Sequence, residues 1–196
     1  MEGLFCEHPK KIAVILPGIG YTCDRPLLYY GGKQAQNLGF EVLRVPYGGF
    51  PQKVRGDVEK MRQSADMALN QTEDMLQNID WEQYGQILFI AKSVGTVVAT
   101  AYAHAHGLSC KCILFTPVEA TFAVPVENAI AFHGTADPWV ETETLKRLCR
   151  EANVPLHITE NANHSLETGD VGKDIDHLKT VMARAEAFLR GGDMKQ

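Results

Sequence analysis

Three side chains suited to covalent acyl transfer, Ser93, Asp137 and His164, each follow a short aliphatic segment. A serine hydroxyl becomes a strong nucleophile when an imidazole removes its proton, and a carboxylate can hold that imidazole in the required orientation. The three residues are far apart in the sequence. They can act together only if the fold brings the ends of the three segments to one place.

The sequence around the serine suits a sharp turn from a strand into a helix. Ala91-Lys92-Ser93-Val94-Gly95 has a small residue two positions before the serine and another two positions after it, where the backbone of such a turn is crowded. A chain of this length contains roughly one such match by chance. Ser93 could instead act only as the N-cap of the helix that follows.

Asp137 and His164 also have simpler interpretations. Asp137 precedes Pro138, so its carboxylate could bond to nearby backbone in an Asx turn while the proline begins a helix. His164 is one of seven histidines and could be an ordinary loop residue. Together, these interpretations require three coincidences at three strand ends, so we favour a joint role for the three residues.

Six short segments rich in Ile, Val, Leu and Phe are predicted to be strands. Both faces of each segment are apolar, as is typical of parallel strands covered by helices on both sides. The predicted strands are Lys11–Leu16, Phe40–Val45, Gln86–Ala91, Lys111–Phe115, Asn128–Phe132 and Leu156–Thr159. The segments between them include stretches of helical period, the clearest at residues 61–79, 94–106 and 175–189.

This alternation predicts an α/β fold with one domain over residues 1–196. We expect a three-layer α/β/α sandwich around a six-stranded parallel sheet. The carboxyl ends of parallel strands lie at one edge of a sheet, so Ser93, Asp137 and His164 should meet there.

Composition and charge exclude several classes of partner. The 196 residues carry a formal net charge of −5, which provides no basic field for a nucleic-acid backbone. Aliphatic runs such as Ile12–Leu16 are far shorter than a membrane span, and the first residues do not resemble a secretory signal. The five cysteines show no pairing pattern, as expected of free thiols in a reducing compartment. We expect a cytoplasmic protein without nucleic-acid or membrane partners.

Two patterns that resemble cofactor or metal sites are incomplete. Gly18-Ile19-Gly20 lacks the third glycine of a dinucleotide fingerprint, because Cys23 stands in its place. Cys110 and Cys112 lack the further ligands of a zinc site. We therefore expect neither a cofactor nor a metal.

Over residues 11–190 the chain resembles the α/β-hydrolase superfamily. The resemblance depends on three segments: Ala-Lys-Ser-Val-Gly, His-Gly-Thr-Ala-Asp-Pro-Trp-Val and Asn-Ala-Asn-His-Ser-Leu. The serine, the aspartate and the histidine of these segments follow one another along the chain in the order that the family has. It implies that Ser93 is the nucleophile, His164 the general base and then acid, and Asp137 the group that orients the imidazole. Together with right-handed crossovers, it also places the first strand between the second and the third.

The resemblance further implies an oxyanion hole made of two backbone N–H groups. One belongs to Val94, and the other comes from the loop after the first strand, with Ile19 preferred and Gly20 as the alternative. Pro17 stands in that loop where many members have a histidine.

The chain resembles a small, lidless member of the family, similar to compact serine esterases and dienelactone-hydrolase-like proteins. It begins at the family's third strand, so the first two edge strands are expected to be absent. About 12 residues separate the fourth and fifth predicted strands, too few for a helical lid.

Four further residues at strand ends are candidates for lining a substrate site. Tyr21 and Trp139 are aromatic, although aromatics at such positions more often serve in packing. Lys92 could contact an acidic substrate group, although a solvent-facing lysine is the simpler expectation. Glu119 follows the fourth strand and is an alternative to Asp137 as the acid, or else a solvated loop carboxylate.

The implied function is a serine hydrolase that cleaves an ester, thioester or related acyl bond of a small soluble substrate. The alternative is a catalytically silent binding or scaffolding protein of the same fold. The acyl group, the leaving group and the oligomeric state stay open.

Overall fold

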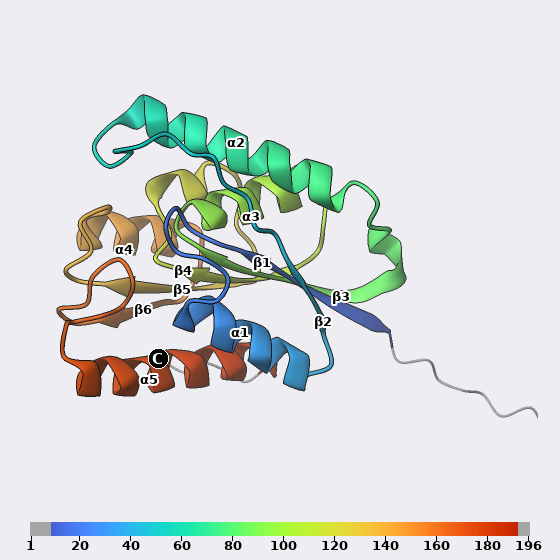
Figure 1. Cartoon of the computed structure of the whole chain (residues 1–196). Coiled ribbons are helices and arrows are strands. Elements are labelled where there is room, and N and C mark those ends of the chain that lie inside the picture. Colours follow the sequence, from blue (N-terminus) through green and yellow to red (C-terminus); the bar gives the residue numbers. More distant parts are fainter. Residues whose placement is uncertain (1–8, 192–196) are drawn as a thin grey trace, which may run out of the picture.

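The computed structural model describes residues 9–191 and has a central six-stranded sheet between two layers of helices (Figure 1). The spatial order of the strands is β2-β1-β3-β4-β5-β6, and every neighbouring pair is parallel. Both the parallel sheet and the position of the first strand between the second and third are therefore confirmed. The strands are β1 (Lys10–Leu16), β2 (Glu41–Arg44), β3 (Tyr84–Lys92), β4 (Lys111–Phe115), β5 (Ala129–Gly134) and β6 (Leu156–Thr159).

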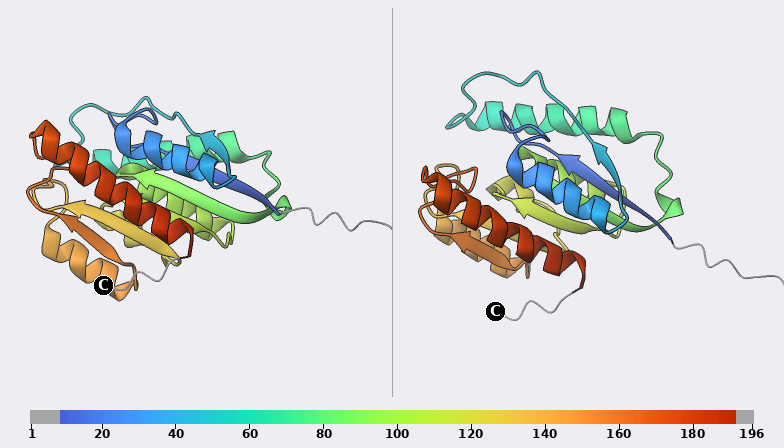
Figure 2. Two further views of the ribbon diagram at one scale, coloured as in Figure 1. Left: turned by 90° about the horizontal axis from the view of Figure 1, so that it is seen from below. Right: turned by 60° about the horizontal axis from the view of Figure 1, so that its bottom comes forward.

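Helices cover both faces of this sheet. One face carries α1 (Pro26–Asn37) and α5 (Val171–Leu189), which lie side by side (Figure 2). The other face carries α2 (Val58–Leu76), α3 (Val94–Ala105) and α4 (Thr142–Glu151) (Figure 1). Two short 3₁₀ helices, η1 (Trp81–Gln83) and η2 (Glu119–Phe122), complete the elements.

The core consists of two apolar clusters, one on each face of the sheet. Along β1, Ala13 and Ile15 belong to the cluster beneath α1 and α5, and Val14 and Leu16 belong to the cluster beneath α2 and α3. All four side chains are fully buried. Burial on both faces explains why the strands are continuous aliphatic runs rather than alternating ones.

Strand boundaries differ from the predicted ones where local backbone or polar residues decide them. β5 begins at Ala129, not Asn128, because Asn128 has a positive φ of 51° that an extended strand does not allow. β3 begins at Tyr84 instead of Gln86, through pairing of Tyr84 with Lys10 that an aliphatic pattern does not reveal.

The connection from β4 to β5 contains only η2 and irregular backbone, so no lid is inserted there. Within residues 9–191, no helix has the length and apolar character needed to span a membrane.

Gly95 allows the start of α3 to pack against the end of β1. A Cβ atom at this position would lie 2.3 Å from the carbonyl oxygen of Leu16 and 2.6 Å from that of Pro17. Both obstacles are backbone atoms, which cannot rotate away. The small residue two positions after Ser93 is thus a steric requirement of the turn between β3 and α3.

We expect Gly95→Ala to lower the free energy of unfolding by about 1–3 kcal/mol or more, because the added methyl overlaps the end of β1. The matched control is Gly48→Ala, where a Cβ meets no atom within 4 Å, and there the change should stay within about 0.5 kcal/mol. Urea denaturation of both variants measures the difference. Equal effects in the two variants would contradict this account.

Candidate active site

Ser93 occupies a strained turn between β3 and α3. Its backbone has φ 56° and ψ −123°, a conformation that costs a non-glycine residue on the order of 1–3 kcal/mol. The turn is held by the Ser93 N–H, which donates to the Phe115 carbonyl at 3.0 Å, and by the Thr96 N–H, which donates to the Ser93 carbonyl at 2.8 Å. The Ser93 side chain makes no capping hydrogen bond. Ser93 therefore stands at the N-cap position of α3 but does not cap the helix through its side chain.

The structure places His164 between Ser93 and Asp137. Nε2 of the imidazole lies 2.8 Å from Ser93 Oγ, and Nδ1 lies 2.7 Å from Asp137 Oδ2. An ionised carboxylate can only accept, so Nδ1 carries the proton and Nε2 is left to accept from the serine hydroxyl. This is the arrangement in which the imidazole can take the serine proton.

Asp137 makes the contacts expected from both of the interpretations that the sequence left as alternatives. Oδ1 accepts the backbone N–H of Trp139 at 2.9 Å, which is an Asx turn, while Oδ2 accepts from His164. The Asp137 side chain has no exposed surface. The turn holds the carboxylate in place, so that only one of its oxygens is available to the imidazole.

The loop that carries His164 is held by the Asn163 side chain and by close contact with β5. Asn163 Oδ1 accepts the N–H groups of Ser165 at 2.7 Å and Glu167 at 3.2 Å. A Cβ atom on Gly134, at the end of β5, would lie 2.2 Å from the Ala162 carbonyl oxygen. The absence of a side chain at Gly134 thus lets this loop approach the segment that carries Asp137.

His133 lies behind Asp137 and was not singled out by the sequence. Its side chain is fully buried, with Nδ1 3.8 Å from Asp137 Oδ2 and Nε2 3.0 Å from Thr142 Oγ1. Burial lowers the pKa of His133, against the opposing effect of the Asp137 charge. The signal available in the sequence was its position four residues before Asp137, at the end of a fully buried strand.

Burial chiefly lowers the pKa of His164, and the charge of Lys92 acts in the same direction. The hydrogen bond to Asp137 opposes both effects. The indole of Trp139 stacks on the imidazole, with ring centroids 5.3 Å apart and an angle of 28° between the planes. This ring covers one face of His164 and helps to exclude water from it.

Three residues that line the same cavity as Ser93 have backbone N–H groups without a partner in the described part of the chain. No hydrogen bond is formed by the N–H groups of Val94, Ile19 or Gly20 within residues 9–191. In the same loop, by contrast, the Gly18 and Tyr21 N–H groups each donate to the other's carbonyl at 3.1 Å. Val94 and the two loop residues therefore have N–H groups that no described residue uses. Ile19 and Gly20 both remain candidates for the second donor.

A cavity of about 550 Å³ opens beside Ser93 and His164. Tyr21, Lys92 and Trp139 line it, as do Ile19, Gly20 and Val94. Glu119 does not line this cavity, and its side chain is exposed, so the prediction that it lines the site is wrong. The neighbouring residues Val118 and Ala120 form the wall instead, because the 3₁₀ turn of η2 sends consecutive side chains in different directions.

One wall of the cavity comes from α2 and the loop before it, which the sequence analysis missed. Val54, Val58, Met61 and Ala65 contribute this apolar surface. Met61 and Ala65 have the helical spacing of a packing face, and that spacing is the same whether the face meets a core or a cavity.

The simpler expectation, that Lys92 faces solvent, is wrong, because its side chain is buried. Only 2% of the residue is exposed. Its Nζ lies 4.9 Å from the centre of the Tyr21 ring.

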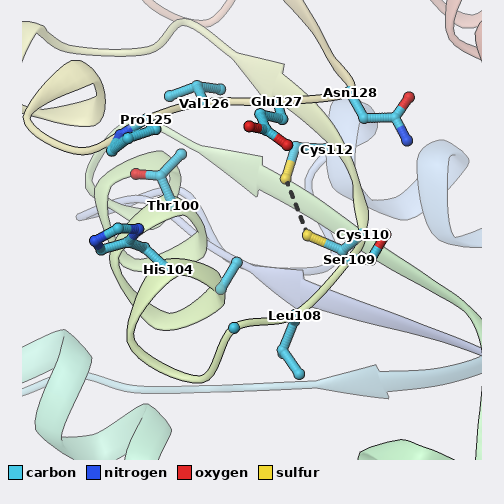
Figure 3. Close-up of a pocket in the computed structure, with 12 residues that line it drawn as sticks. Thr100, His104, Leu108, Ser109, Cys110, Cys112, Pro125, Val126, Glu127 and Asn128 are labelled. Atoms are coloured by element: carbon cyan, nitrogen blue, oxygen red, sulfur yellow. Dashed lines mark hydrogen bonds between the residues drawn. The ribbon is translucent and has the colours of Figure 1, made fainter.

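A second cavity, of about 370 Å³, lies away from these residues at the amino-terminal end of β4 (Figure 3). It contains Cys110 and Cys112, with their sulfur atoms 3.9 Å apart, between the end of α3 and residues 125–128. Ser93, Asp137 and His164 take no part in it.

No protein-family model and no curated protein matches this sequence. Solved structures do match it. Est1E from Butyrivibrio proteoclasticus, with ferulic acid bound, superposes with a TM-score of 0.68 at 14% identity over 96% of this chain and 92% of that one. An alpha-beta serine hydrolase homologue from Coxiella burnetii gives 0.61 at 16% identity over 91% and 86%. A protein of unknown function from Agrobacterium tumefaciens gives 0.63 at 17% identity over 95% and 88%.

The chain has the α/β-hydrolase fold, in a small form with a six-stranded parallel sheet. At these identities the likeness establishes the fold alone.

We expect NMR titration to place the pKa of the His164 imidazole below its ordinary value of 6.5, because burial disfavours the charged ring. Trp139→Ala should raise this pKa, since it opens one face of the imidazole to water. The other tryptophan is the matched control: Trp81 packs on Phe89 and Tyr102, so Trp81→Ala should leave the His164 titration in place. A pKa at or above 6.5, or no response to loss of the Trp139 indole, would contradict this account.

Proposed function

We propose that this protein is a serine hydrolase that cleaves an ester, thioester or related acyl bond through an acyl-enzyme. The observation that carries the proposal is the unbroken hydrogen-bonded line from Asp137 through His164 to Ser93, with links of 2.7 and 2.8 Å, at the wall of a cavity. Hydrogen-bond contact between nucleophile and base, with the base held by a third group, is the signature of an activated serine.

In the first half of the reaction, the substrate carbonyl lies against Ser93. His164 Nε2 takes the hydroxyl proton while Oγ attacks the carbonyl carbon, which forms a tetrahedral intermediate with a negative oxygen. The N–H of Val94 and that of Ile19 or Gly20 stabilise this oxygen. His164 then gives the proton to the leaving alcohol or thiol as the bond to it breaks, and the acyl group remains on Ser93.

In the second half, water takes the place of the leaving group. His164 removes a proton from this water, which attacks the acyl-enzyme and forms a second tetrahedral intermediate. Return of the proton to Ser93 Oγ releases the carboxylic acid. Asp137 stays ionised throughout and stabilises the imidazolium that forms in each half.

The descriptions of the structural neighbours favour this proposal. One is described as an alpha-beta serine hydrolase homologue, and another was solved with ferulic acid bound. The strained backbone at Ser93 also favours the proposal, because residues held in such conformations are concentrated at active sites.

We further propose that the substrate is small and soluble. The short connection between β4 and β5 provides no helical lid to cover a long acyl chain. The apolar wall is limited to the side chains around a cavity of about 550 Å³. Each buried methylene contributes about 0.8 kcal/mol, and a chain that extends beyond this wall gains nothing more.

We expect a fluorophosphonate probe to label the protein covalently and Ser93→Ala to abolish the labelling, because the probe reacts with an activated serine. The same change should lower kcat on a reactive ester on the order of a thousandfold or more.

Two controls belong with this experiment. Ser165 lines the same cavity, but its hydroxyl makes no hydrogen bond within residues 9–191, so Ser165→Ala should still be labelled. Cys23 is a buried free cysteine in the segment after β1, so Cys23→Ala should also still be labelled, which excludes labelling of its thiol. Labelling that survives in Ser93→Ala, or that is absent from the unaltered protein, would reject the proposal and favour a catalytically silent binding protein.

For esters from acetyl to palmitoyl, we expect kcat/KM to rise over the first few carbons, by up to about fourfold per buried methylene, and then to level off. Detergent micelles should not activate the reaction. The measurement is kcat/KM along the series with and without detergent. A steady rise to palmitoyl, or activation above the micelle concentration, would refute the small-substrate proposal and leave the role of Ser93 untouched.

A further inference from the structure

Lys92 is a buried residue beside the nucleophile, and no group in the described part of the chain pairs with its charge. It is the last residue of β3, and only 2% of its surface is exposed. Within residues 9–191, no carboxylate lies within 4.0 Å of its Nζ, and the ammonium makes no hydrogen bond to the protein. Its closest described partner is the ring of Tyr21, whose centre lies 4.9 Å from Nζ.

The nearby carboxylates are not available to this ammonium. Asp137 acts on Lys92 only through space, because neither of its oxygens lies within 4.0 Å of Lys92 Nζ. Glu167 also acts only through space and is itself exposed, so solvent screens its charge. A buried charge without a close partner is costly, which means that a stable fold would normally pair it or expose it.

The backbone around Lys92 makes room for its side chain. Gly18 lies against it, and a Cβ atom at that position would come 2.9 Å from Lys92 Cδ. The side chain passes over this glycine and reaches the wall of the cavity that also contains Ser93 and His164.

Arg62, a further cation of the same wall, is already neutralised. It forms ion pairs with Glu59 at 2.6 Å and with Asp66 at 3.0 Å. Lys92 is therefore the cavity cation whose charge is uncompensated in the described part of the chain.

We propose that Lys92 binds a carboxylate of the substrate, so that the preferred substrates are short acyl esters or thioesters with a carboxylate a few carbons from the scissile carbonyl. This inference rests on the hydrolase proposed above. An ammonium next to the nucleophile and at the cavity wall can pair with such a group while the carbonyl lies against Ser93. The bound carboxylate supplies the counter-charge that the protein lacks.

Two pairs of esters with matched shapes test this proposal. Monomethyl glutarate and monomethyl succinate each carry a carboxylate, and in methyl glutaramate and methyl succinamate an amide of similar shape replaces it. We expect kcat/KM to be about ten- to hundredfold higher for the carboxylate esters, the size of a charge-assisted hydrogen bond. Lys92→Met, which keeps the length of the side chain, should lower kcat/KM for the carboxylate esters at least about tenfold more than for the amides.

Arg62→Met is the matched control and should keep the preference, because its charge is already paired. The preference should also decline as the pH rises through about 8, since burial lowers the pKa of Lys92 to about 8. The titratable groups around Lys92 are Tyr21, Asp137, His164 and Glu167. Their titration changes catalysis equally for the carboxylate ester and for its matched amide. The ratio of the two kcat/KM values therefore follows the titration of Lys92.

A separate measurement distinguishes failure of this proposal from failure of the proposed hydrolase. Calorimetric titration of Ser93→Ala with monomethyl glutarate and with methyl glutaramate measures binding without turnover. Tighter binding of the carboxylate ester that is lost in Ser93→Ala/Lys92→Met would support the anion site even if no ester is cleaved. Equal kcat/KM and equal binding for the two members of a pair, or equal losses for both in Lys92→Met, would overturn it.

Discussion

The hydrogen bond between the Asp137 carboxylate and the His164 imidazole is the interaction on which the rest of the site depends. It fixes the proton on Nδ1, so that Nε2 faces Ser93 as an acceptor. The bond requires the loops after β5 and β6 to come into backbone contact, which the missing side chain of Gly134 permits. The parallel sheet makes that approach available, because the carboxyl ends of all six strands lie at one edge.

Two buried ionisable side chains, Asp137 and Lys92, belong to the site, and they differ in how many close partners the protein gives them. Asp137 accepts two hydrogen bonds from within the chain, and its position is thereby fixed. Lys92 has a ring face beside it and, among residues 9–191, no carboxylate within 4.0 Å. A buried charge without a partner is costly. A charged group that already has its hydrogen bonds can hold another side chain in position, whereas one without a partner gains most from a ligand of opposite charge. The proposed anion site depends on this difference between the two residues.

The sequence by itself determined the layered fold and the end of each strand at which Ser93, Asp137 and His164 lie. Continuous aliphatic runs indicate strands that are buried on both faces, and the small residues around Ser93 indicate a crowded turn. Both are local properties, so they can be detected without knowledge of distant neighbours. Boundaries were less accurate where a positive φ, as at Asn128, or pairing through polar residues set the end of a strand.

Only the tertiary structure decided which other side chains reach the site. Glu119 follows a strand and Lys92 ends one, but Glu119 is exposed and Lys92 is buried. The difference lies in what covers them: Tyr21 and Gly18, more than 70 residues before Lys92 in the chain, enclose its side chain. The helical spacing of the apolar residues around Met61 likewise does not distinguish the wall of a cavity from a packed core. Burial depends on contacts between residues distant in sequence, and no local pattern records those contacts.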